Sequence, residues 1–141
     1  MNNIKIKQAL TGGIAATAVM TIIMLIAPMM GMPDMKIGNM MANFMGMPIW
    51  IGWAMHLMIG IVWAMLYVFL VRDKLSMTYA LRGMLFAVVL WVLMQLMVMP
   101  MMGMGIFSSN TPDALKMVMG TLMGHLIYRL VLGLITKPNQ N

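Results

Sequence analysis

The 141-residue chain is apolar and nearly free of acids: hydrophobic residues make up 62% of it, charged residues 9%, and its mean hydropathy is +0.92. Soluble domains carry about 25% charged residues, so this composition excludes that class. The absence of cysteine excludes disulfide bonds, thiolate metal sites and covalent c-type haem attachment. The net charge of +6 is not gathered into a basic patch with interleaved aromatic residues, so we expect no nucleic-acid partner.

Four apolar segments account for most of the chain, at residues 9–30, 48–71, 83–102 and 114–135. Because a helix rises about 1.5 Å per residue, a segment of about twenty residues can cross a hydrocarbon core of roughly 30 Å. The sequence therefore predicts an all-α fold, a four-transmembrane-helix bundle, in a single integral membrane domain over residues 1–141.

The segment between the first two spans predicts a short helix of its own. Pro33-Asp34 is typical of a helix start. Apolar side chains then recur at helical spacing, with polar residues on the opposite side, at Ile37, Met40, Met41, Phe44 and Met45. We expect this amphipathic segment to lie as an interfacial helix on the outer side of the membrane.

A short repeat indicates that the bundle is two duplicated helical hairpins. The pentad Pro28-Met29-Met30-Gly31-Met32 returns at residues 100–104, and each copy ends an apolar run. The next apolar run contains His56-Leu57 in the first copy and His125-Leu126 in the second. We therefore expect a pseudo-twofold axis along the membrane normal that places the two histidines at related positions.

The distribution of basic residues predicts the orientation. On one side of a four-span arrangement lie Lys5, Lys7, Arg72, Lys74, Arg82 and Lys137, and only Lys36 and Lys116 lie on the other. Cytoplasmic loops carry the excess of lysine and arginine. We expect a multi-pass protein of the cell (inner) membrane with both termini in the cytoplasm.

Polar side chains inside the spans are the first candidate site. His56, His125, Gln95 and Thr21 fall at similar depths in the outer half of the bundle. One interpretation is an interhelical hydrogen-bonded layer that fixes helix pairing. The other is a cofactor site in which His56 and His125 are axial ligands of a b-type haem, with glycines near each histidine leaving room for the macrocycle.

Arg129 extends this polar group deeper into the membrane. It lies four residues beyond His125 on the same helix face. A charge at such a depth is costly unless its side chain reaches the inner interface or finds a partner.

The methionines form the second candidate site. The chain contains 25 methionines, and most of them fall at mid-membrane or on the outer side. Methionine used only as a core filler would occur in both halves. Thioether clusters suit soft cations such as Cu(I). The candidate metal ligands are those of the two pentads, Met29, Met30, Met32, Met101, Met102 and Met104. Packing without a metal is the alternative.

Three stretches resemble a known family. They are residues 27–33, residues 53–60, which read WAMHLMIG, and residues 124–128, which read GHLIY. The chain resembles an uncharacterised family of small four-helix bacterial membrane proteins, a domain of unknown function. The resemblance covers most of the chain and supports the four-helix architecture, but it implies no activity, cofactor or partner.

Three functions remain open from the sequence. The first is a non-catalytic membrane subunit or accessory protein whose polar layer is structural. The second is a b-type haem-binding electron-transfer protein, and the third is a Cu(I) or soft-metal binding or transfer protein. No nucleophile–base pair, phosphate loop or carboxylate pair indicates an enzyme. The expected surroundings are the lipid bilayer and either other membrane subunits or further copies of the chain.

Overall fold

The computed structural model describes residues 2–74 and 76–137, and within these ranges the chain is helical with no strand. The long elements are α1 (Asn2–Ile26), α3 (Ile49–Leu66), α4 (Tyr79–Leu93) and α6 (Ala114–Thr136). The short ones are η1 (Ala27–Met30), α2 (Ile37–Met45), η2 (Tyr67–Val71), η3 (Met94–Val98), α5 (Met99–Met101) and η4 (Ile106–Ser108). The prediction of an all-α fold with four helices able to span a membrane is confirmed.

The membrane-length helices, with the short elements that continue them, run over Asn3–Met30, Ile49–Val71, Tyr79–Met101 and Ala114–Thr136. The first begins earlier than the expected 9–30, because the polar residues before it continue the same helix. The third begins earlier than 83 because Thr78 caps it, with the hydroxyl accepting from the Leu81 amide at 3.4 Å.

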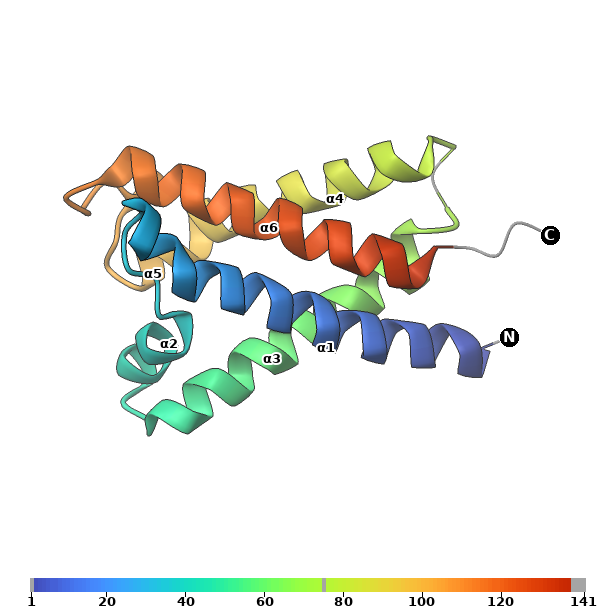
Figure 1. Ribbon diagram of the computed structural model, residues 1–141, viewed down its shortest axis with the longest axis horizontal. Coiled ribbons are helices and arrows are strands. Elements are labelled where there is room, and N and C mark those ends of the chain that lie inside the picture. Colours follow the sequence, from blue (N-terminus) through green and yellow to red (C-terminus); the bar gives the residue numbers. More distant parts are fainter. Residues whose placement is uncertain (1, 75, 138–141) are drawn as a thin grey trace.

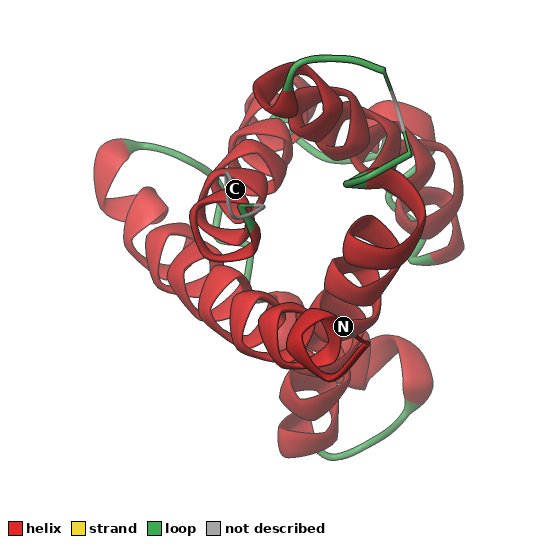
Figure 2. Cartoon of the chain, turned by 90° about the vertical axis from the view of Figure 1, so that its right-hand side faces the viewer, coloured by secondary structure: helices red, strands yellow, loops and turns green. Residues whose placement is uncertain are grey.

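The helices pack in the order α3, α1, α6, α4, so α1 lies between α3 and α6 (Figure 1). The N-terminal end of α1 and the C-terminal end of α6 lie at the same end of the bundle, which faces the viewer in Figure 2. We call this the basic end, because Lys5, Arg72 and Arg82 lie there. The opposite end, which holds α2, is the α2 end.

Close approach of the helix backbones depends on glycine. A Cβ at Gly13 would lie 2.8 Å from the Ile61 Cα atom, so only glycine lets α1 and α3 come this close. A Cβ at Gly52 would overlap the Gly38 carbonyl oxygen. The short helix α2 therefore packs directly on the start of α3. Such small-residue contacts are typical of helix association in membranes.

The two pentads fold into the same turn. Gly31 and Gly103 both have a φ of 80°, the left-handed conformation that glycine adopts without strain. The Gly31 amide donates to the Pro28 oxygen at 3.1 Å, and the Gly103 amide donates to the Pro100 oxygen at 3.0 Å. The following amides, of Met32 and Met104, each reach back five residues. Each pentad thus ends a long helix in the same way.

At the basic end, a polar cluster joins the segment after η2 to α1 and α6. Arg72, after η2, donates from Nη1 to the Gln8 Oε1 atom at 2.8 Å and to the Thr136 carbonyl oxygen at 3.1 Å. Asp73 accepts from Arg72 Nε at 2.9 Å and from Lys5 Nζ at 2.7 Å. These contacts tie the end of the second span to α1 and α6.

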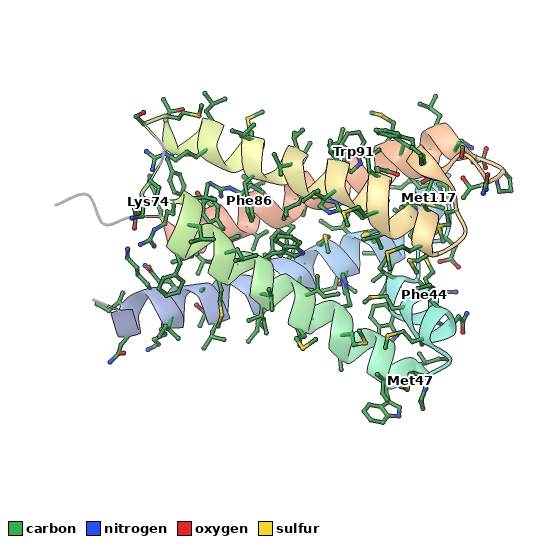
Figure 3. The ribbon with its side chains drawn as sticks, turned by 180° about the vertical axis from the view of Figure 1, so that it is seen from behind. Phe44, Met47, Lys74, Phe86, Trp91 and Met117 are labelled. Atoms are coloured by element: carbon green, nitrogen blue, oxygen red, sulfur yellow. The ribbon has the colours of Figure 1, made fainter. Side chains whose placement is uncertain are left out.

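Helices α3 and α4 meet through aromatic side chains in the basic half of the bundle. The Phe86 ring centroid lies 5.2 Å from that of Tyr67 and 6.4 Å from that of Trp63. Beyond Phe86 the two helices diverge toward the α2 end, as Figure 3 shows. In that half α3 packs on α2 rather than on α4.

Candidate functional site

A cavity of about 460 Å³ lies where α3 and α4 diverge. Its lining is almost wholly apolar and comes from every long helix and from α2. The lining residues are Met20, Met24, Ile37, Met41, His56, Ile59, Gly60, Trp63, Leu90, Leu93, Met94, Met97, Val98, Met99, Met101, Met102, Thr121, His125 and Tyr128.

The cavity opens on the outside of the bundle, along the line between α3 and α4. Ile59 on α3, Leu93 on α4 and Met97 on η3 all line it and are all exposed on the surface of the chain. Because these rim residues belong to membrane-length helices, the opening faces the region that acyl chains occupy when the helices span a bilayer.

Tyr128 forms the floor of the cavity. Its hydroxyl donates to the Gly60 carbonyl oxygen and so joins α6 to α3 across the bundle. Below it lies the main core, in which Tyr67, Val68 and Leu132 are fully buried. The cavity is therefore confined to the half of the bundle nearer α2.

His125 lines this cavity from α6. Its Nδ1 atom lies 2.8 Å from the Thr121 carbonyl oxygen, one turn earlier on α6. A carbonyl oxygen can only accept, so Nδ1 carries the proton and Nε2 of the neutral ring is an acceptor. Nε2 makes no hydrogen bond to any residue that the structure describes. The imidazole is thus held in one tautomer with a lone pair left over, as in histidines that bind a ligand or a metal.

His56 lines the same cavity from α3. Its Nε2 atom lies 3.0 Å from the Thr21 hydroxyl on α1, and its ring makes an edge contact with Trp53 at 6.3 Å between centroids. The structure therefore places the two histidines around one space. It pairs one of them with Thr21, a member of the predicted polar layer.

Gln95 belongs to a hydrogen-bonded cluster between α4 and α6 that shares Thr121 with the cavity lining. The π-helical turn η3 buries it completely. Its Nε2 atom donates to the Thr121 hydroxyl at 2.9 Å, and its Oε1 atom accepts from the Ser108 hydroxyl at 3.3 Å. Trp91 also donates to Thr121, at 3.2 Å. Sequence reasoning missed Thr121, Ser108 and Trp91, although the position of Thr121 one turn before His125 was a usable signal.

Arg129 lies apart from the other members of the predicted layer, in the basic half of the bundle. Its Nη2 atom donates to the Tyr67 hydroxyl at 2.7 Å, and its Cζ atom lies 4.4 Å and 5.0 Å from the ring centroids of Tyr67 and Tyr79. It is buried, and Nη2 also donates to the Tyr79 carbonyl oxygen at 3.3 Å, at the start of α4. Two tyrosine rings and two glycines, Gly83 and Gly133, enclose the guanidinium.

The six predicted methionine ligands are not gathered at one point. Met29 and Met30 are 87% and 82% exposed, whereas Met101 and Met102 line the cavity. Other methionines are buried together, at Met24, Met35 and Met117 with Met20 beside them. Among the described residues, no group of three or more histidine, cysteine, aspartate or glutamate side chains could hold a metal ion.

The chain belongs to a family of unknown function (DUF6789), whose pattern matches residues 3–140. The resemblance to an uncharacterised family is therefore confirmed. No curated protein and no solved structure matches the chain.

Proposed function

We propose that this chain is a non-catalytic membrane protein that holds an apolar guest molecule in the cavity between α3 and α4. It would act in the lipid bilayer as a subunit or accessory protein, with other membrane proteins or with further copies of itself. The observation that carries this proposal is the opening of an apolar cavity on the lipid-facing side, between Ile59 and Leu93.

An apolar guest can enter this cavity from the acyl-chain region without crossing water. Sites for small ligands are mostly apolar, with a few polar groups that fix orientation. Here the available polar group is His125 Nε2, an acceptor with no partner among the described residues. The guest that fits best is therefore an apolar molecule with one hydroxyl or N–H donor. The Gln95 cluster is hydrogen-bonded within the protein and serves to hold α4 against α6.

Binding of two matched probes tests this proposal. The protein in lipid nanodiscs should bind 1-naphthol more tightly than naphthalene, because only the former donates to His125. His125→Phe should remove that preference. Leu93→Trp, which fills the cavity, should weaken binding of both probes about tenfold or more. Leu134 is exposed on α6 and does not line the cavity, so Leu134→Trp is the control. Equal binding by all variants would contradict the proposal.

A b-type haem is a second candidate for the same cavity, favoured by the lone pair of His125 Nε2. His125 would be an iron ligand, and the second would be His56, which would have to give up its hydrogen bond to Thr21. Protein from haem-replete cells should then carry a Soret band that is lost in both His125→Ala and His56→Ala. A colourless protein would contradict this candidate and would leave the first proposal standing.

We also propose that the basic end faces the cytoplasm and that the protein lies in the cell (inner) membrane. Lys5, Arg72, Asp73 and Gln8 meet at that end, in line with the positive-inside rule. Reporter fusions after Lys74 and after residue 141 should report the cytoplasm, and one near Asn39 should report the outside. A cytoplasmic signal at Asn39 would contradict this orientation.

A further inference from the structure

Four methionines from three separate segments meet near the α2 end of the bundle. Met24 on α1, Met35 between η1 and α2, and Met117 on α6 are 8%, 3% and 8% exposed, and Met20 packs against them. Figure 3 shows Met117 at the end of the molecule that also holds Phe44 of α2. These residues are 97 positions apart at their extremes, Met20 and Met117, so only the fold brings them together.

The ends of the methionine side chains pack against α6 at Gly120 and Gly124, which have no side chains. A Cβ at Gly124 would lie 3.3 Å from the Met24 Sδ atom and 3.7 Å from the Met20 Sδ atom. A Cβ at Gly120, one turn earlier, would lie 2.8 Å from the Met35 Cε atom, 3.8 Å from the Met35 Sδ atom and 2.9 Å from the Met32 Cε atom. The two glycines thus leave space into which at least three sulfurs reach.

The donors in this cluster are soft and uncharged. The nearest acid in sequence, Asp34, pairs with Lys36 at 2.9 Å, and both side chains are exposed. Hard cations such as Mg²⁺ and Ca²⁺ need oxygen ligands, which the four thioethers do not supply. Thioethers instead favour soft monovalent cations. Each methionine has three rotatable side-chain bonds, so the sulfurs can converge on an ion without movement of the backbone.

We infer that Met20, Met24, Met35 and Met117 form a binding site for one soft monovalent cation, Cu(I) or Ag(I). The site is independent of the proposed guest binding, although Met20 and Met24 also line the cavity. Of the pentad set predicted from sequence, Met32 lies beside this site at Gly120. Met29 and Met30 of that set are exposed, and so offer no enclosed site.

Titration with Ag(I) tests the inference in detergent-solubilised protein. The unmodified chain should bind one equivalent, and Met24→Leu/Met35→Leu/Met117→Leu should weaken that binding at least about tenfold. The matched control is Met29→Leu/Met30→Leu/Met101→Leu, which replaces three exposed methionines and should bind as the unmodified chain does. Leucine is close to methionine in volume, so the buried triple variant should fold.

A second measurement needs no substitution. In protein labelled at the methionine methyl carbons, Ag(I) should shift the resonances of Met20, Met24, Met35 and Met117 and leave those of Met29 and Met30 unchanged. The inference is overturned if Ag(I) does not bind, if the exposed triple variant loses binding instead, or if the shifted methyl groups are those of Met29 and Met30. None of these outcomes bears on the binding of 1-naphthol.

Discussion

The repeat relates two helix–helix contacts, α1/α6 and α4/α3, and these two contacts differ in this structure. The pentads end α1 and the α4–α5 stretch in the same turn, so the repeat pairs α1 with α4 and α3 with α6. The α1/α3 contact then corresponds to α4/α6, and both are packed. The α1/α6 contact corresponds to α4/α3. The first of these is the most extensive in the bundle, whereas the second is open over half its length.

Side-chain size explains the difference. A glycine from each helix lies in the closed contact: Gly12 on α1 faces Leu132 of α6, and Gly124 on α6 faces Met24 of α1. The open contact carries large side chains on both helices, Ile59 and Trp63 on α3 and Leu90, Leu93 and Met94 on α4 and η3. In lipid, apolar surface alone does not drive helices together, and close packing of small residues does. The open contact therefore remains available to a lipid-like guest.

The largest effect on this arrangement is expected at Gly83, where α4 meets α6. A Cβ there would overlap the Nε and Cζ atoms of Arg129. Gly83→Ala should displace the guanidinium from Tyr67 and Tyr79, at a cost of about 2–4 kcal/mol. Thermal unfolding in detergent measures this. The double variant Gly83→Ala/Arg129→Leu should recover part of the loss. An unchanged stability of Gly83→Ala would contradict the role given to Arg129.

A smaller effect separates the two contacts directly. A Cβ at Gly12 would lie 2.9 Å from the Leu132 Cδ1 atom in the closed contact. Gly12→Leu should therefore destabilise the fold by about 1–3 kcal/mol. Leu93→Trp, in the open contact, should change stability by less than about 0.5 kcal/mol, because the larger ring enters the cavity. Equal losses in the two variants would mean that both contacts are equally packed.

The smallest effect concerns the basic end, where both contacts are closed. The hydrogen bond from Arg72 lowers the pKa of Asp73 from 3.8 to about 2, with Lys5 adding to the effect. Because the folded-state pKa is depressed, the stabilisation is present above pH 3.8 and is lost as the pH falls toward about 2. The side chain is 36% exposed, so the loss should be slight. Unfolding measured against pH should show it in the unmodified chain and not in Asp73→Asn.

The sequence predicted the helices well and the cavity not at all. Hydropathy and length identify membrane-length helices because the bilayer fixes both. The angle at which α3 and α4 diverge depends on Phe86, Tyr67 and Trp63, whose contacts no spacing rule supplies.

The site residues, too, divide into those that the sequence predicted and those that it did not. The repeat placed His56 and His125 in one region, and both line the cavity, but their ligand roles stay predictions. The partners Thr121 and Ser108 lie 26 and 13 residues from Gln95 in sequence, so no local pattern joins them to it. The buried methionines were missed because each lies in a different segment and only their side-chain directions make them neighbours.

Guest binding requires that the cavity be open to the acyl-chain region between α3 and α4, and contacts between lipid and methionine methyl groups test this opening directly. Met20 lies on α1 and lines the cavity, whereas Met97 lies on its rim and is exposed. In nanodiscs, nuclear Overhauser effects from acyl-chain protons should reach both methyl groups but not the buried Met117. Effects at Met97 alone, with none at Met20, would mean that the two helices are closed in the membrane, and would contradict the account.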